Sequence, residues 1–330
     1  MTDYNPYIEP AQQQIPEQKK RFRLGISLNI ILFILTFFTT TIAGVAWMNR
    51  DPYDLDNFSF GITYAVLILF ILSCHEFGHY FAAKYHKVKV TLPYFIPFPF
   101  LMLNPFGTMG AVIRMKAATQ TRKALFDIGI AGPIAGFIAS LFVLIWGMTH
   151  LPPIDYLFAI HPEYAAMGIP TEGFAFGNTL LYAGLTKIFT SSPSVFMPPM
   201  NEMYHYPFLC VGWFGLLVTA LNLLPVGQLD GGHIVYALFK EKHKLLARAF
   251  FMFTLVLGIV GLLQFVGITM FERYGLLNWL VWSALIYFVI KIDHPPLYDN
   301  EPLGTGRQLL GWFALFMFVT SFTPVIITSY

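Results

Sequence analysis

The residues with the clearest chemical potential lie in the segment Cys74-His75-Glu76-Phe77-Gly78-His79. Residues four apart share one face of a helix, so the imidazoles of His75 and His79 can bind one metal ion together. Glu76 lies beside them and can take a proton from a water molecule on that metal. The H-E-x-x-H spacing therefore predicts a zinc site with a general base next to it.

A third zinc ligand must come from elsewhere, because a catalytic zinc ion takes three protein ligands and keeps one position open for water. Asp230 is the candidate, since it is the only acidic residue at the inner end of the apolar run Pro207–Pro225. An alternative is that Asp230 caps a short helix over Gly231–Phe239. Spacing alone does not separate ligand from cap, and the incomplete zinc site favours the ligand.

Composition indicates the surroundings of this site. The 330-residue chain is 56% hydrophobic and 12% charged, with a mean hydropathy of +0.61. Soluble domains are about 45–50% apolar and about 25% charged, so a soluble enzyme and a disordered protein are excluded. A net charge of +2 offers no basic surface for nucleic acid, and Cys74 and Cys210 lie in apolar runs that argue against a disulfide framework. We therefore expect an all-α polytopic membrane protein.

About seven transmembrane helices are expected, because a bilayer span needs about 20 apolar residues. The candidate runs are Ile26–Trp47, Phe60–Ala82, Ala124–Met148, Pro207–Pro225, Leu245–Gly267, Gly275–Ile292 and Gln308–Thr328. With the N-terminus in the cytoplasm, all but three of the 20 Lys and Arg residues lie on the cytoplasmic side. The exceptions are Arg50, Lys187 and Arg273. Because cytoplasmic loops are rich in Lys and Arg, this orientation is favoured and places the metal site near the cytoplasmic face.

Two segments do not fit simple spans. The segment Thr91–Met115 is apolar but contains four prolines, which break a helix, and Asn104–Gly107 is typical of a turn. Both flanks are cytoplasmic by charge, so a re-entrant β-hairpin over residues 91–115 is predicted. Within the long outer loop from Thr149 to Tyr206, Phe176–Phe189 is expected to be a short interfacial helix rather than an eighth span.

These elements divide the chain into three expected parts. Residues 1–23 form a mobile cytoplasmic arm. Residues 24–240 form the metal-binding core, which includes the hairpin 91–115 and the extracytoplasmic loop 149–206. Residues 241–330 supply additional transmembrane helices.

Three motifs together resemble those of the site-2 proteases, the intramembrane zinc metalloproteases of peptidase family M50. They are H-E-F-G-H at His75–His79, N-x-x-P-x-x-x-L-D-G at Asn222–Gly231, and G-P-I-A-G at Gly132–Gly136. The resemblance covers a core from about Gly61 to Phe239. Beyond this core, His294-Pro295-Pro296 and the closing hydrophobic run resemble a branch with plastid and bacterial members.

The resemblance implies a role for each motif residue. The implied zinc ligands are His75, His79 and Asp230, and the implied catalytic acid/base is Glu76. The implied substrate-binding residues are Asn222, Asn104, Gly107 and Gly110. From spacing alone, each of these residues also has a structural explanation. Asn222 could form a hydrogen bond between helices, and Gly107 and Gly110 could serve the geometry of the turn. Gly132 and Gly136 form a G-x-x-x-G pattern that is typical of close helix packing.

The implied function is zinc-dependent intramembrane proteolysis, with one catalytic zinc ion. The substrates would be peptide bonds in or near the transmembrane helices of single-pass or other membrane proteins. Besides these substrates, the lipid bilayer is the expected partner, and no oligomeric state is predicted. The protein would be multi-pass in a cell inner membrane or an organelle membrane.

Three other classes of function are considered as alternatives. A catalytically silent membrane scaffold could keep the same fold, although the complete set of His75, Glu76, His79 and Asp230 argues against it. A metal or solute transporter would show paired repeats with broken helices in matching places. Neither the H-E-x-x-H span nor the Asp230 span is repeated in the sequence. A membrane-tethered peptidase for soluble substrates would need a hydrophilic catalytic domain, and no hydrophilic stretch of this sequence is long enough to form one.

Overall fold

The computed structural model describes residues 18–102, 104–116, 121–171, 173–190, 195–268, 270, 276–297, 299 and 301–329. Its α-helices are α1 (Gln18–Trp47), α2 (Phe58–Tyr85), α3 (Arg122–Thr149), α4 (Asp155–Ile160), α5 (Tyr164–Met167), α6 (Leu180–Phe189), α7 (Pro207–Asn222), α8 (Asp230–Phe239), α9 (His243–Leu262), α10 (Asn278–Leu285) and α11 (Thr305–Ser321). Strand β1 (Tyr94–Pro97) pairs with β2 (Thr108–Val112), and β3 (Phe174–Phe176) pairs with β4 (Ile327–Ser329), both antiparallel. Of the predicted arm 1–23, residues 1–17 lie outside the described residues, and α1 already begins at Gln18.

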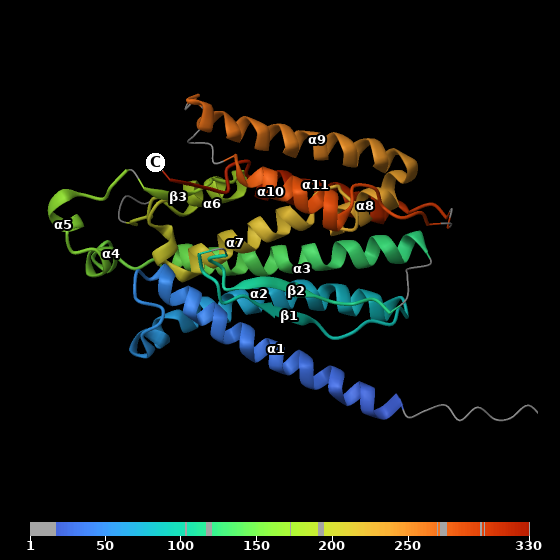
Figure 1. Ribbon diagram of the computed structural model, residues 1–330, viewed down its shortest axis with the longest axis horizontal. Coiled ribbons are helices and arrows are strands. Elements are labelled where there is room, and N and C mark those ends of the chain that lie inside the picture. Colours follow the sequence, from blue (N-terminus) through green and yellow to red (C-terminus); the bar gives the residue numbers. More distant parts are fainter. Residues whose placement is uncertain are drawn as a thin grey trace, which may run out of the picture.

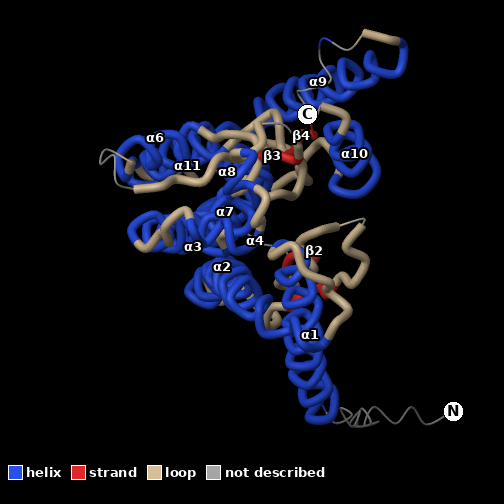
Figure 2. Tube along the Cα trace, turned by 90° about the vertical axis from the view of Figure 1, so that its left-hand side faces the viewer, coloured by secondary structure: helices blue, strands red, loops and turns tan. Residues whose placement is uncertain are grey.

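The long helices lie side by side along the long axis of the molecule (Figure 1). Helix α2 packs against α3, α3 packs against α7, and α1 covers the outer side of α2 (Figure 2). The helices cross closely where they carry glycine: a Cβ at Gly61 of α2 would collide with the Thr41 carbonyl of α1. Inside a bilayer the hydrophobic effect does not drive helices together, because lipid tails are as apolar as the helices. Small residues at the contact let the two backbones approach and gain van der Waals contacts instead.

Four helical segments are long and apolar enough to cross a membrane. They are Ile26–Trp47, Leu55–Tyr85, Arg122–Thr149 and Asp230–Val266. The last one joins α8 to α9 through the 3₁₀ turn Lys240–Lys242. Three other predicted runs form shorter helices, namely the 16-residue α7, the stretch Asn278–Ile290 with its π-helical end, and the 17-residue α11. A mostly helical, multi-pass membrane protein is therefore supported, while the number seven stays a prediction.

The predicted hairpin is present as strands β1 and β2. Its turn is built by Asn104, whose Nδ2 donates to the Thr108 carbonyl at 2.9 Å and whose Oδ1 accepts from the Phe106 N–H at 2.9 Å. Helix α1 holds the hairpin in place, because Asn29 Nδ2 donates to the Pro93 carbonyl at 2.7 Å and the Trp47 indole donates to the Pro105 carbonyl at 3.0 Å. The depth of the hairpin in a membrane stays a prediction.

The last predicted run, Gln308–Thr328, extends at its C-terminal end beyond the helix that the structure shows. Helix α11 stops at Ser321, because Phe322 is extended and Pro324 cannot continue a helix. The chain then forms β4 beside β3. The Gly177 N–H donates to the Ile326 carbonyl at 3.0 Å, which fastens the end of the chain to the outer loop.

Candidate metal centre

The two motif histidines lie one helical turn apart on α2 and face the same point. Their Nε2 atoms are 3.1 Å apart, and both side chains are buried. Asp230, the first residue of α8, brings its Oδ2 to 3.3 Å from each of these nitrogens. The N-cap of α8 is Leu229, and the Asp230 carboxylate is directed at the imidazoles. The structure thus brings His75, His79 and Asp230 together into one group of potential metal ligands.

These distances fit a single zinc ion. Two ligands on a tetrahedral zinc with bonds of about 2.0 Å lie about 3.3 Å apart. Three acceptor atoms that converge at 3.1–3.3 Å inside a protein leave their lone pairs facing one another. A divalent cation between them would turn this repulsion into coordination.

The surroundings orient the histidine rings for this role. His79 Nδ1 lies 2.7 Å from the Ile128 carbonyl of α3, so it carries the proton and leaves the Nε2 lone pair for a metal. Gly132 and Gly136 of α3 make room for the two rings. A Cβ at Gly132 would collide with the His79 ring, and a Cβ at Gly136 would lie 3.0 Å from His75 Nδ1. This glycine pair therefore serves the site as well as helix packing.

Glu76 lies next to the ligand group and is 6% exposed. Its carboxylate accepts a hydrogen bond from the backbone N–H of Ile113, which directly follows β2. It is also close enough to interact electrostatically with His79 and Asp230. The hairpin and the predicted general base are thus in direct contact.

The predicted substrate-binding residues fall into two groups. Asn222, the last residue of α7, places its Nδ2 3.3 Å from His75 Nε2, beside the ligand atoms. Asn104 and Gly107 serve the hairpin itself, since the Asn104 side chain closes the turn and Gly107 (φ 75°) lies against Thr39 of α1. Gly110 of β2 (φ 92°) faces open space, so it leaves room for another backbone.

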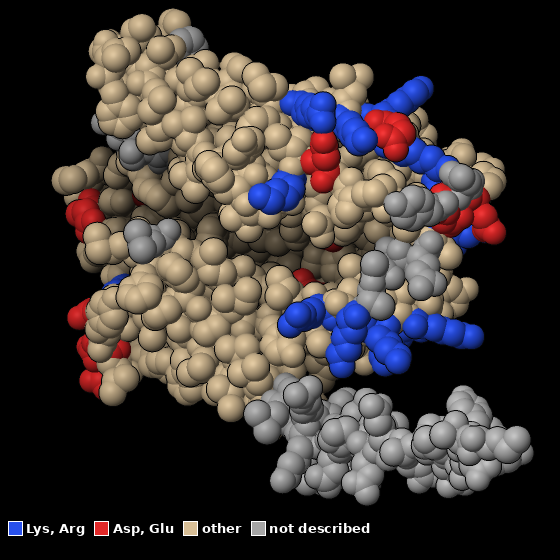
Figure 3. Space-filling view, turned by 45° about the vertical axis from the view of Figure 1, so that its right-hand side comes forward, with Lys and Arg blue, Asp and Glu red and all other residues tan. Residues whose placement is uncertain are grey.

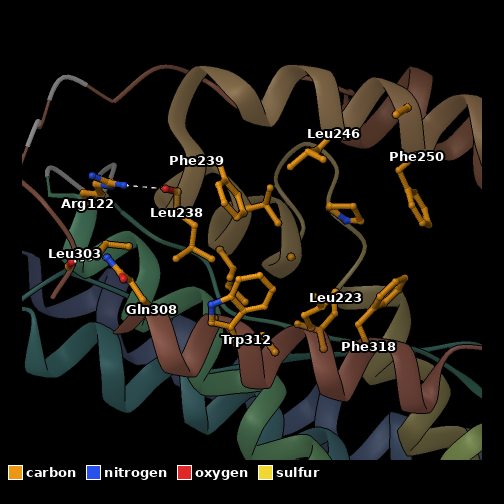
Figure 4. A pocket seen from close by; sticks show the side chains of 18 of the residues that line it. Arg122, Leu223, Leu238, Phe239, Leu246, Phe250, Leu303, Gln308, Trp312 and Phe318 are labelled. Carbon is orange, nitrogen blue, oxygen red and sulfur yellow. Dashed lines mark hydrogen bonds between the residues drawn. The ribbon is translucent and has the colours of Figure 1, made fainter. Parts of the chain in front are cut away.

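A space-filling view shows the molecule hollowed between the hairpin half and the half with α8 and α9, with acidic atoms visible inside the hollow (Figure 3). Lys and Arg side chains gather at one end of both halves, and Asp and Glu at the other end are more numerous than Lys and Arg there. A separate apolar cavity of about 800 Å³ lies between α8, α9 and α11 (Figure 4). Its lining includes Leu223 and Gly231, the chain neighbours of Asn222 and Asp230, but neither of those two residues.

Two polar clusters beside the site were not foreseen from the sequence. His233 Nδ1 lies 2.8 Å from His294 Nε2, which ties α8 to the segment after α10. Asp127 of α3 accepts two hydrogen bonds from Arg307 of α11, at 2.8 and 2.7 Å, and lies 2.8 Å from His86. An ionisable residue in an apolar helix signals a partner, but the sequence does not tell which one.

Comparison with known proteins agrees with this set of side chains. Residues 63–265 match the family model described as peptidase family M50. The chain is 25% identical, over 98% of its length, to a protein of Oryza sativa subsp. indica named "Probable zinc metalloprotease EGY2, chloroplastic", and covers 54% of it. It is 27% identical, over 90% of its length, to "Probable zinc metalloprotease EGY1, chloroplastic" of Arabidopsis thaliana, and covers 52% of that protein.

A further relative is "Probable zinc metalloprotease EGY1, chloroplastic" of Oryza sativa subsp. japonica, which is 30% identical over 80% of the chain, with 40% of that protein covered. The chain thus spans about half the length of the curated relatives it matches. The region that matches the family model extends over more than half of the chain and contains both halves of the ligand group, on α2 and α8. The chain therefore belongs to peptidase family M50.

Proposed function

We propose that this chain is a zinc-dependent endopeptidase that cleaves peptide bonds within a membrane. One observation carries the proposal: the ligand atoms of His75, His79 and Asp230 converge to 3.1–3.3 Å between helices apolar and long enough to cross a bilayer. A zinc ion held there would activate water as a nucleophile and polarise the scissile carbonyl.

The side chains around the ligands would move the proton and hold the substrate. Glu76 takes the proton from the attacking water and gives it to the leaving amine nitrogen, while the water oxygen bonds to the carbonyl carbon and the C–N bond breaks. Asn222 can donate from its amide to a substrate group beside the ligands. The near-complete burial of Glu76 excludes bulk water and strengthens these interactions.

The substrate class we propose is a transmembrane helix of another protein. The peptide bonds of a helix are shielded by its own hydrogen bonds, so a stretch of it must unwind before cleavage. Strand β2 lies at the edge of its two-stranded sheet, and Ile113, the residue that follows it, donates its N–H to Glu76. An unwound segment that pairs with this edge would be extended next to the proposed general base.

The location we propose is a cell inner membrane or an organelle membrane, with the N-terminus in the cytoplasm or its equivalent. The gathering of Lys and Arg at one end of the molecule supports this orientation (Figure 3). That end is also where α8 and the start of α3 lie (Figure 1). The exposed apolar side chains of the long helices would face lipid.

The test combines cleavage with metal content. The purified chain is reconstituted with a panel of single-pass membrane proteins, and the fragments are identified by mass spectrometry. We expect Glu76→Gln to keep the parent zinc content and to lower cleavage by about 10²- to 10⁴-fold, because only the proton carrier is lost. The exposed Glu301→Gln is the matched control and should cleave like the parent.

Metal analysis decides the ligand roles independently of any substrate. His79→Ala and Asp230→Ala should each remove one zinc ion per chain. Parent-like cleavage by Glu76→Gln would show that another residue carries the proton. Parent-like zinc content in both ligand variants would overturn the proposed metal centre.

A further inference from the structure

A second group of potential metal ligands lies in the outer loop, far from the first. It consists of His161, which follows α4, together with Glu202 and His205, and their ligand atoms all lie within 4.8 Å of one another. Helices α4 and α5 lie at the end of the molecule opposite α8 (Figure 1). His161 Nε2 is 2.9 Å from His205 Nε2, which in turn is 3.5 Å from Glu202 Oε2. These distances bracket the separation of about 3.3 Å between two ligands on tetrahedral zinc.

Hydrogen bonds on the far side of each ring fix where the protons are. His161 Nδ1 lies 3.1 Å from Glu163 Oε1, and His205 Nδ1 lies 3.0 Å from the Trp47 carbonyl. Both of these partners are acceptors, so each Nδ1 carries a proton and each neutral ring keeps a lone pair on Nε2. Two lone pairs and a carboxylate oxygen thus face one another with no donor between them. A cation at the centre would satisfy all three.

Glu202 gives a second, independent indication. Its side chain is 3% exposed, and its Oε2 has no hydrogen-bond partner within the described part of the chain. Its other oxygen, Oε1, accepts from the Tyr164 hydroxyl at 3.1 Å. A buried carboxylate oxygen without a partner is costly, because it has lost its hydration. Oε2 is the oxygen nearest His205, where it would coordinate a cation.

The arrangement repeats the one in the first site. There the Nε2 atoms of His75 and His79 lie 3.1 Å apart, and His79 donates from Nδ1 to a backbone carbonyl. Histidine ligands of metals commonly donate their second nitrogen to a carbonyl or a carboxylate, as both histidines of the loop group do. Two imidazoles and one carboxylate are a ligand set that suits zinc.

We propose that His161, Glu202 and His205 bind a second zinc ion that fastens the outer loop to the rest of the molecule. The ion would cross-link His161 to Glu202 and His205 and so close the loop between residues 161 and 205. Through the hydrogen bond from His205 to the Trp47 carbonyl, it would also connect the loop to the end of α1. The Tyr156 hydroxyl, which donates to the His205 carbonyl at 2.7 Å, supports the same connection from α4.

The experiment counts metal ions in the full chain. The protein is purified through a histidine-free tag, loaded with ZnCl₂, dialysed, and analysed for zinc per polypeptide by mass spectrometry. The loop variants are His161→Gln and Glu202→Gln, the matched control is the exposed His150→Gln, and His79→Ala reports on the first site. Size-exclusion chromatography in detergent checks that each variant is folded.

We expect about two zinc ions in the parent and in His150→Gln, and about one in each loop variant. His79→Ala should keep one, which separates this proposal from the proposed protease site. A parent that holds a single ion, lost in His79→Ala and kept in both loop variants, would mean that the three loop groups share a proton instead, and the proposal would be wrong. A second ion that persists in both loop variants would be an adventitious ion only and would equally overturn it. If neither loop variant folds, a parent that holds one zinc ion together with a folded His79→Ala that holds none would still overturn the proposal.

Discussion

At the scale of single residues, Gly132 is the position where the helix packing and the metal chemistry meet. A methyl group there would collide with the His79 ring, so Gly132→Ala must displace the ligand or separate α3 from α2. We expect this variant to bind zinc at the His75–His79–Asp230 site about 10- to 100-fold more weakly, as found for other residues that orient metal ligands. Competition with a chelator of known zinc affinity measures the change.

Gly184 of α6 provides the control for this substitution. It is also helical, and a Cβ there would meet no atom within 4 Å. Gly184→Ala should therefore leave zinc affinity unchanged. If Gly132→Ala bound zinc as tightly as Gly184→Ala does, the glycine would serve helix packing alone.

The residues with chemistry were predictable to different degrees. The residue types and spacing of His75 and His79 predicted a metal site, the incomplete ligand set favoured Asp230, and the family resemblance added Asn222. The structure brings these four side chains together. The role of Gly132 was underestimated, because a G-x-x-x-G pattern does not reveal whether a backbone or an imidazole fills the space. The sequence did not connect His161 with Glu202 and His205, since 40 residues separate His161 from Glu202 and no motif links them.

At the scale of elements, His294 connects the segment after α10 to α8. Its ring is 8% exposed and stacks on Tyr236, with ring centroids 4.2 Å apart. Its Nδ1 donates to the Pro295 carbonyl at 2.6 Å, so its Nε2 accepts from His233 Nδ1 at 2.8 Å. Burial lowers the pKa of His294 below its usual value. Protonation would place two donors, His294 Nε2 and His233 Nδ1, against each other.

This connection predicts how stability depends on pH. In the unfolded chain His294 binds a proton below about pH 6.5, whereas in the folded protein it does so only at lower pH. The folded state therefore loses stability as the pH falls below about 6.5. We expect the difference in Tm between pH 7.5 and pH 5.5 to be smaller in His294→Gln than in the parent. His150→Gln, at an exposed position, should show the parent difference, and an unchanged difference in His294→Gln would contradict the assignment.

The elements also show what local sequence can and cannot predict. The β1–β2 hairpin was predictable because four prolines exclude a helix and Asn104-Pro105-Phe106-Gly107 favours a turn. The β3–β4 pair was not, because its strands are three residues each and lie about 150 residues apart in the chain. Apolarity alone extended the last predicted helix to Thr328, past Pro324. A long-range backbone partner at Phe174–Phe176 draws these residues into a strand instead.

At the scale of the whole molecule, the helices after residue 240 pack against helices that come before it. Helix α11 packs against α3 and α7, and β4 completes a sheet with the outer loop. The predicted division at residue 240 stays a prediction, and packing contacts run across it. The Lys and Arg side chains at one end of the molecule lie on both of its halves (Figure 3).

A doubly hydrogen-bonded ion pair across this division joins Arg307 of α11 to Asp127 of α3. The guanidinium and the carboxylate form two hydrogen bonds of 2.8 and 2.7 Å, and both side chains are partly buried. We expect a double-mutant cycle of Asp127→Asn and Arg307→Met to give an interaction energy of about 1–2 kcal/mol, measured by unfolding in mixed detergent micelles. Removing Asp127 leaves the Arg307 guanidinium without its carboxylate, and removing Arg307 leaves Asp127 with His86 alone, so each single variant should be less stable than the parent.

The pair Lys123–Glu301 offers a control that also connects the start of α3 to the segment before α11. Its nitrogen and oxygen are 2.7 Å apart, but its side chains are 41% and 66% exposed. Water and salt screen such a pair, so the same cycle with Lys123→Met and Glu301→Gln should give about 0–1 kcal/mol. Equal interaction energies for the two pairs would mean that Asp127 and Arg307 contribute no more than a surface contact. The attachment of the last helix to the core would then depend on its apolar packing and on the backbone hydrogen bonds of β4.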